Sequence, residues 1–282
     1  MKRSVISILL CITLLFGMLS LNAGAAKQAH YLMLGDSIAY GSGLANPKAA
    51  VYGKIVADTN GYAYENDAVP GYTTDDLMRR MEADAVRDEI AGADIINISI
   101  GGNNFLRGNL SGLLFESIVK GEYARLDEIA AGFYDDLVKI VDTIRTLNSN
   151  AAILLQTLYN PQTGDVGKVY QQGADRLNAK IRDYEKKNPG QILIADVAKA
   201  LTDSEHDFAA DRIHPSAAGN EKIAKVILQT LFDNGLGSKT EPVIHTKGVD
   251  TSGAVMFSWF VDLYGRFFHL LGVLCGLLQK LG

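Results

Sequence analysis

Three residues of this chain could together activate a nucleophile: Ser37, Asp211 and His214. Ser37 follows an apolar run at 31–34 and a glycine, which places it just past the end of an expected strand. A serine hydroxyl needs a base within about 2.6–3.2 Å, and that base must be held in one tautomer. His214 is the best candidate, because Asp211 precedes it by three residues and a turn brings such residues within about 7 Å between Cα atoms. The pattern predicts acyl transfer by a Ser-His-Asp arrangement.

Two further short motifs follow strand-like runs. Pro-Gly71-Tyr follows the second run, and Gly-Gly-Asn103-Asn follows the third. Taken singly, each has an ordinary explanation: Gly71 as a turn glycine, Asn103 as a helix cap, and Asp211 as the cap of a turn that leaves His214 in solvent. In open α/β sheets, however, ligands bind outside the carboxyl ends of the strands, where all of these residues are expected.

In this order, the motifs resemble the SGNH hydrolases, also called GDSL esterases and lipases. The resemblance covers roughly residues 30–232 and places a hydrolase domain at 27–232. The four signature residues of the family match Ser37, Gly71, Asn103 and His214, and Asp211 occupies the family's Asp-x-x-His position. The resemblance implies that Ser37, Asp211 and His214 are catalytic.

The resemblance also implies an oxyanion hole formed by the backbone N–H groups of Ser37 and Gly71 and the side-chain amide of Asn103. The chemistry agrees, because a glycine lets the backbone approach a ligand and an amide is a fixed neutral donor. Two positions depart from the family's pattern. Ile38 stands where the family has leucine, and Asn104 stands where many members have an acidic residue.

The elements that must position these residues alternate along the chain. Apolar runs of strand length alternate with stretches of helical period, which predicts a parallel sheet with helices on both faces. Near-continuous apolar runs suit strands that are buried on both faces. The family resemblance adds the strand order 2-1-3-4-5. The expected fold class is therefore α/β, a flavodoxin-like three-layer sandwich with a five-stranded parallel sheet, its strands near 31–34, 62–66, 94–100, 151–157 and 191–195.

Helices are expected between these strands. Thr73 and the two aspartates that follow at 75–76 are typical of a helix start. Apolar residues recur on one helical stripe from 129 to 147, and a further helix is predicted around 168–186. The last helix of the domain is predicted to begin after His214, where Pro215 suits a first helical turn.

The N-terminal residues 1–26 have the three regions of a secretory signal peptide. Lys2 and Arg3 precede an apolar run, and Ala23-Gly-Ala25 fits a cleavage site. An uncleaved membrane anchor is the alternative. The expected location is secreted or extracytoplasmic, either free or held at the membrane surface.

Composition excludes several classes of function. The formal net charge is −5, and loss of residues 1–26 deletes two basic residues and no acid, which gives −7. Such a balance argues against a nucleic-acid partner. We expect no metal, because the sequence has neither an H-E-x-x-H motif nor a Cys/His cluster. Gly41-Ser-Gly43 lacks the third glycine of a dinucleotide loop, so no cofactor is expected.

The chain beyond the domain divides into two segments. Residues 233–253 are polar and glycine-containing, which predicts a linker, and residues 254–282 form an apolar helical segment. A membrane-spanning helix needs about 20 consecutive apolar residues, and charged residues interrupt this run. We expect an amphipathic helix in peripheral contact with a membrane; packing on the domain or self-association is the alternative. Its polar stripe is Ser258, Asp262, Arg266 and His269.

These observations predict a secreted serine esterase or lipase that hydrolyses small-molecule or lipid carboxylic esters through an acyl-enzyme. Two alternatives stay open: an O-acetyl esterase that acts on cell-wall carbohydrate, and a non-catalytic surface-binding module on the same scaffold. The enzyme is favoured because a binding module has no need to keep Ser37, Asp211 and His214 together.

Overall fold

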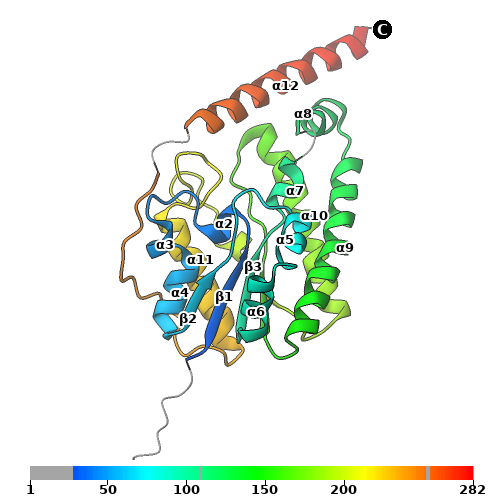
Figure 1. Cartoon of the computed structure of the whole chain (residues 1–282). Helices are drawn as coiled ribbons and strands as arrows, with labels where there is room; N and C mark the ends of the chain where they lie inside the picture. The colour runs from blue at the N-terminus through cyan, green and yellow to red at the C-terminus, as the bar shows by residue number, and fades with distance from the viewer. Residues whose placement is uncertain (1–27, 108–109, 252–254, 282) are drawn as a thin grey trace, which may run out of the picture.

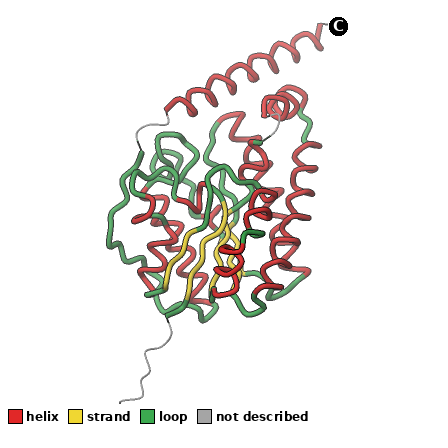
Figure 2. The backbone as a smooth tube through the Cα atoms, in the orientation of Figure 1, coloured by secondary structure: helices red, strands yellow, loops and turns green. Residues whose placement is uncertain are grey.

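Five parallel strands form the centre of the structure, a computed structural model that describes residues 28–107, 110–251 and 255–281. The strands lie in the order β2-β1-β3-β4-β5, and every neighbouring pair is parallel. Helices cover both faces of the sheet, so the predicted three-layer α/β fold is confirmed (Figures 1 and 2). The strands are β1 (His30–Gly35), β2 (Ala63–Asn66), β3 (Ile95–Ser99), β4 (Ala152–Gln156) and β5 (Leu193–Ala195).

Two groups of helices sandwich the sheet. One face is covered by α4 (Tyr52–Asn60) and α11 (Ala217–Asp233), and the other by α5 (Thr74–Arg80), α6 (Asp84–Gly92), α9 (Ala124–Leu147) and α10 (Gly164–Lys187). Figure 1 shows a last helix crossing above the end of the domain that carries α2 and α7. The remaining elements are α2 (Ser37–Tyr40), α3 (Pro47–Ala50), α7 (Gly102–Leu106), α8 (Leu110–Leu114), the π-helical turn η1 (Phe115–Lys120), the 3-10 turn η2 (Val197–Lys199) and that last helix, α12 (Val255–Leu281).

The strands bury side chains on both faces. In β1, Leu32 and Leu34 join the apolar cluster under α5, α6, α9 and α10, whereas Tyr31 and Met33 join the cluster under α4 and α11. All four side chains are completely buried. Burial on both faces explains why this strand has a continuous apolar sequence instead of an alternating one.

A chain of buried polar side chains crosses the sheet within the α4/α11 face. Asn97 Nδ2 donates a hydrogen bond to the Tyr31 hydroxyl at 2.5 Å. Gln156 Nε2 donates to Asn97 Oδ1 at 2.9 Å and to the Tyr52 hydroxyl at 2.8 Å. Burial raises the pKa of both tyrosines, so their hydroxyls stay neutral. Because each of these polar groups has a hydrogen-bond partner, the four side chains can lie inside the core without a large desolvation cost.

The carboxyl ends of β1 and β3 lie very close to each other. Gly35 pairs with Ser99, and the Asp36 N–H donates to the Ser99 carbonyl at 3.0 Å. Gly35 has a φ of +135°, and a Cβ at this position would lie 2.0 Å from the Ser99 oxygen, so the close approach requires glycine. The strand order reverses between β1 and β3, and crevices at such switch points are the usual ligand sites of open α/β sheets.

Helix starts show one confirmed prediction and one that was wrong. Thr73 caps α5 in a reciprocal capping box with Asp76. The last helix of the domain, in contrast, does not include Pro215 in its first turn. It begins two residues later, at Ala217, because the Ser216 hydroxyl accepts the Gly219 N–H at 3.0 Å and so serves as the cap.

The segment that connects α11 to α12 is attached to the domain surface. The Thr251 N–H donates to the Gly43 carbonyl at 2.8 Å, and the Ala217 N–H donates to the Asp250 carboxylate at 2.6 Å. Leu44 and Asp250 form an isolated antiparallel bridge. The segment predicted as a linker therefore braces the loop that follows α2.

The C-terminal segment is helical, as predicted. The predicted signal peptide, residues 1–26, lies outside the described residues. Within 28–107, 110–251 and 255–281, no helix meets the length and apolarity that crossing a membrane requires.

Candidate active site

Ser37 lies at the start of α2, directly after β1. Asp36 caps this short helix, since its carboxylate accepts the Ile38 N–H at 3.0 Å. Ser37 is half-buried and faces a small hollow that Asn103 also lines. The hollow opens over the carboxyl ends of β1, β3 and β4, and Ser99 and Gln156 form its floor. Ser37 and Asn103, predicted to act on the same atom, therefore share one cavity.

Asp36 is buried beneath the site. Burial raises the pKa of its carboxyl to about 7, against the opposing effects of the Ile38 N–H and of the nearby His214. The residue is therefore only partly ionised near neutral pH.

The Asp211–His214 pair has the geometry that its spacing predicts. His214 Nδ1 lies 2.5 Å from Asp211 Oδ2, and Asp211 Oδ1 accepts the backbone N–H groups of Ile213 and His214 at 2.9 and 3.0 Å. Burial raises the pKa of Asp211, but the hydrogen bonds and charge of His214 outweigh it and hold the value below its ordinary range. An ionised Asp211 can therefore orient the imidazole.

The loop that carries this pair is held by bonds to neighbouring segments. The Tyr159 hydroxyl donates to the Ile213 carbonyl at 2.9 Å, and Gln162 Nε2 donates to the Arg212 carbonyl at 2.7 Å. Arg212 has a φ of +54°, a left-handed conformation that costs energy for a side chain of this size. The sequence contained no signal for these contacts, because Tyr159 and Gln162 lie about 50 residues away.

His214 also lies beside the loop that follows Ser37. A Cβ on Gly43, whose φ is +100°, would come within 2.9 Å of His214 Cβ, so glycine is needed for this approach. In the described part of the chain, no hydrogen bond joins Ser37 Oγ to His214. Hydrogen bonds between catalytic groups often tighten only when substrate binds.

A hydrogen bond to Tyr72, the residue after Gly71, holds Asn103 close to the Gly71 turn. Asn103 Nδ2 donates to the Tyr72 carbonyl at 2.9 Å, which uses one of its two N–H groups. Gly71 has a φ of +84°, a conformation that glycine adopts without strain. The Val69 N–H donates to the Gly35 carbonyl at 3.0 Å, so the Gly71 turn is fixed to the end of β1. The three predicted oxyanion donors therefore come from adjoining segments.

Asn104 supports the Asn103 turn from outside the hollow. Its Oδ1 accepts the Thr74 N–H at 3.2 Å and its Nδ2 donates to Thr74 Oγ1 at 2.8 Å. Thr74 Oγ1 in turn donates to Asp136 at 2.6 Å. The amide at this position, where many family members have an acid, thus links the turn to α5 and α9.

Two histidines outside the predicted triad also face aspartates. His206 has Asp203 three residues before it, the same spacing as the predicted pair, and their contact is 2.9 Å. The His206 side chain is 74% exposed, however, whereas that of His214 is 20% exposed. His269 contacts Asp165 at the domain surface. The spacing from an aspartate does not distinguish His214 from His206. The burial of the His214 side chain beside the loop that follows Ser37 does.

Within residues 28–107, 110–251 and 255–281, no three His, Cys, Asp or Glu side chains are grouped so that they could hold a metal ion. The side chains and backbone of the chain itself supply the groups for the proposed ester hydrolysis.

Comparison with known proteins identifies the class. Residues 33–222 match the GDSL-like lipase/acylhydrolase family, and the chain belongs to this family. The protein is accordingly a carboxylic ester hydrolase. The predicted resemblance is confirmed.

One relative and two solved structures illustrate the range of similar proteins. The chain is 26% identical to the uncharacterized protein YpmR of Bacillus subtilis (strain 168) over 219 residues, which are 72% of this chain and 81% of that protein. The lipase Lip_vut3 from a goat rumen metagenome has the same fold, with a TM-score of 0.62 and 19% identity over 74% of this chain and 99% of that one. A family 3 carbohydrate esterase from Clostridium thermocellum aligns with a TM-score of 0.51 and 16% identity over 75% and 100%. Because these two structures are named for different substrates, the fold does not select one.

Proposed function

We propose that the protein is a serine esterase in which Ser37 is the nucleophile and His214 its base. The observation that carries the proposal is the 2.5 Å contact between Asp211 and His214 Nδ1, which favours the tautomer whose Nε2 can accept the Ser37 proton. Ser37 Oγ attacks the ester carbonyl as His214 takes its proton. The tetrahedral intermediate then expels the alcohol, which receives that proton, and the acyl-enzyme is hydrolysed by water through the same steps.

In this proposal, the negative charge on the carbonyl oxygen is stabilised at the junction of three segments. The donors are the N–H groups of Ser37 and Gly71 and the second N–H of the Asn103 amide. The bond from Asn103 to the Tyr72 carbonyl supports this role, since it fixes the amide before substrate arrives. Donors that are oriented in advance stabilise the transition state without a cost of reorganisation.

A covalent label tests the nucleophile directly. The full chain is treated with a sulfonyl fluoride, and the modified residue is located by peptide mass spectrometry. We expect a single adduct on Ser37 and loss of nitrophenyl acetate hydrolysis in parallel with labelling. Labelling elsewhere, or activity that survives complete labelling of Ser37, would contradict the proposal. An ester panel from acetylated sugars to long-chain lipids distinguishes a carbohydrate esterase from a lipid esterase.

We propose an extracytoplasmic location on the basis of residues 1–26, whose charge, apolar run and Ala23-Gly-Ala25 fit a cleaved leader. The test is the N-terminal residue of the protein recovered from cells. A chain that begins just after Ala25 or Ala26 supports export with cleavage. A chain that keeps Lys2 and Arg3 contradicts cleavage, and its recovery in the cytosolic fraction instead of the membrane fraction contradicts export.

We further propose that α12 lies on a lipid surface. The polar side of this helix faces its own domain, because Asp262 pairs with Arg212 at 3.2 Å and His269 lies 2.5 Å from Asp165. Phe268 is buried and meets Phe115 of η1 edge to face. The domain contacts therefore use Asp262 and His269 together with the apolar side chains of Tyr264, Phe268 and Leu271.

The opposite side of α12 is an apolar row. Its spacing of three or four residues puts the row on one helical stripe, and its members are 47–68% exposed. A helix that turns polar groups to its own domain and leucines outward suits the boundary of a bilayer, where each buried apolar side chain stabilises binding. The row consists of Leu263, Phe267, Leu270, Leu274, Leu277 and Leu278.

The test is flotation of the full chain with phosphatidylcholine vesicles. We expect the wild type to float and the double variant Phe267→Asp, Leu270→Asp to stay in the dense fraction. Phe232→Asp on α11 is the control, since Phe232 is an exposed aromatic residue outside this row. Equal flotation of all three proteins, or a dimer that only the double variant disrupts, would refute the lipid assignment.

A further inference from the structure

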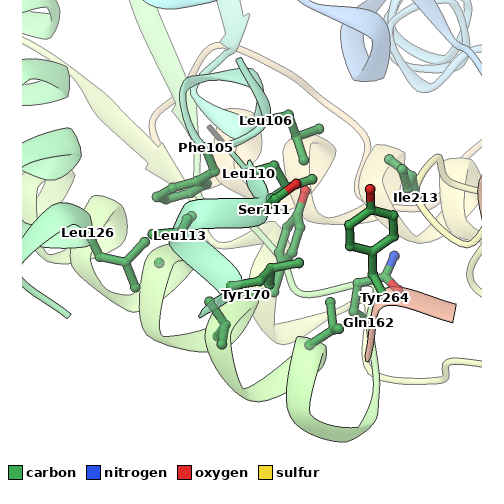
Figure 3. Close-up of a pocket in the computed structure, with 14 residues that line it drawn as sticks. Phe105, Leu106, Leu110, Ser111, Leu113, Leu126, Gln162, Tyr170, Ile213 and Tyr264 are labelled. Carbon is green, nitrogen blue, oxygen red and sulfur yellow. The ribbon is translucent and has the colours of Figure 1, made fainter. Parts of the chain in front are cut away.

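An apolar cavity of about 210 Å³ lies between the domain and α12. Figure 3 shows its labelled side chains converging from α7, α8, α10 and α12. Leu110 and Leu113 contribute from α8, Val166 and Val169 from α10, and Tyr264 from α12. Apolar side chains dominate the lining, so a ligand that enters it gains chiefly from leaving water.

The wall that α12 supplies lies outside the part of the chain that matches the family. The family match ends at residue 222, and Tyr264 lies well beyond it. Tyr264 is half-buried and packs on Phe268, whose ring centre is 5.9 Å away. Gly265, the next residue, sits directly on α10, because a Cβ there would come within 3.0 Å of Val166. The helix is therefore seated closely enough for Tyr264 to close one side of the cavity.

The cavity adjoins the hollow in which Ser37 lies. The same three side chains, Leu106, Tyr170 and Ile213, line both spaces. Tyr170 lines the hollow together with Asp36 and Ser37, so it lies at the boundary between the two spaces. Ile213 immediately precedes His214. One space is therefore lined by Ser37 and Asn103, and the next is an apolar extension of it.

We infer that this cavity receives the acyl chain of the ester, with its carbonyl at Ser37 and its far end against Tyr264. An apolar cavity of about 150 Å³ is large enough to bind benzene, so a larger one accepts an acyl chain longer than about six carbons. The inference rests on the proposed function and names its substrates as esters of medium-chain fatty acids. Tyr264 is then a specificity-determining residue that the C-terminal helix adds.

The test compares acyl-chain selectivity in the full chain. Turnover of nitrophenyl acetate and of nitrophenyl dodecanoate is measured for the wild type, Val169→Phe, which fills the cavity, and Tyr264→Ala, which removes its wall. Each methylene excluded from an apolar site costs roughly fourfold, so we expect kcat/KM for the dodecanoate to fall about tenfold or more while the acetate changes less than about twofold. Phe232→Ala is the matched control, because it truncates an exposed aromatic side chain of α11 that belongs neither to the cavity lining nor to the outward row of α12.

Binding provides a readout that does not depend on turnover. Dodecanoic acid should raise the thermal midpoint of the wild type and of Phe232→Ala, and it should protect Val169→Phe and Tyr264→Ala much less. Selectivity and protection that are unchanged in both cavity variants would overturn the inference, even if nitrophenyl acetate is hydrolysed. Protection without any ester hydrolysis would instead refute the proposed function and leave the chain-binding cavity in place. A variant that does not melt cooperatively is replaced in the comparison by the other.

Discussion

The turn at Ser37 and the helix α12 border adjoining spaces but are held in very different ways. The Ser37 turn is fixed by backbone hydrogen bonds at the ends of completely buried strands, and Gly35 brings β1 against Ser99. Helix α12 is held by Phe268 and by ion pairs with Arg212 and Asp165 at the surface. The Ser37 turn is thus fixed in the core of the domain, whereas α12 is packed on the domain surface, so the two regions should respond separately to substitution.

Removal of the nucleophile is expected to have the largest effect on kcat. Ser37→Ala should lower kcat for every ester by about 10⁴-fold or more, because the hydroxyl is the group that the acyl chain bonds to. The fold should not change, since Ser37 is only half-buried. The measurements are steady-state hydrolysis of nitrophenyl acetate and thermal melting. A folded variant with near-wild-type turnover would rule out the mechanism.

Removal of one oxyanion donor should have a smaller effect. Asn103→Ala is expected to lower kcat by about 10² to 10³-fold, the usual contribution of such a donor. Asn104→Ala is the control: it breaks the bonds to Thr74 and leaves the donor in place, so its effect on kcat should be much smaller. If Asn103→Ala changed only KM, the amide would bind the substrate without stabilising the transition state.

The buried carboxyl beneath the site should appear in the pH dependence of stability. The pKa of Asp36 is raised from 3.8 to about 7 in the folded protein, so the native state holds an extra proton between these values. The free energy of unfolding should therefore fall as pH rises from about 4 to 7, by at most about 1.4 kcal/mol per pH unit. Asp36→Asn keeps the acceptor for the Ile38 N–H but cannot ionise.

The measurement is urea unfolding of wild type and Asp36→Asn at several pH values. The difference between the two curves should grow in favour of the variant up to about pH 7 and then level off. A constant difference across this range would mean that Asp36 titrates as an exposed carboxyl does.

The smallest expected effect concerns the attachment of α12. Exposed ion pairs stabilise proteins by about 1 kcal/mol or less, so Asp262→Asn combined with His269→Gln should leave global unfolding nearly unchanged. Amide hydrogen exchange in α12 should nevertheless become faster, and exchange in β1 and β3 should not. Equal acceleration in the strands would show that the helix and the catalytic turn form a single cooperative unit.

Much of the fold could be predicted because its signals are local. The apolar runs marked all five strands, and Thr73 with Asp76 marked the start of α5. The site motifs were visible for the same reason: each is a few residues long and follows a strand. The strand order came from the family resemblance, and the chemical roles of Ser37, Gly71, Asn103, Asp211 and His214 stay predictions.

What the sequence did not indicate depends on contacts between distant residues. Asn97 and Gln156 lie in the core because each hydrogen-bonds to a side chain on another element. Hydrophobic periodicity does not predict such pairings. The polar stripe of α12 was recognised, but not that it turns toward the domain, since Asp165 lies about a hundred residues earlier. The Asp203–His206 pair shows the reverse problem: its spacing is right, but its exposed position is not visible in the sequence.

The attachment of Thr251 to Gly43 limits how far α12 can travel. Four residue steps separate Thr251 from Val255, and an extended chain of that length spans at most about 14 Å. While the bond between Thr251 and the Gly43 carbonyl holds, the start of the helix stays within that radius of the loop beside His214. A bilayer that binds α12 would thus keep the loop beside His214 within that distance of the start of the membrane-bound helix.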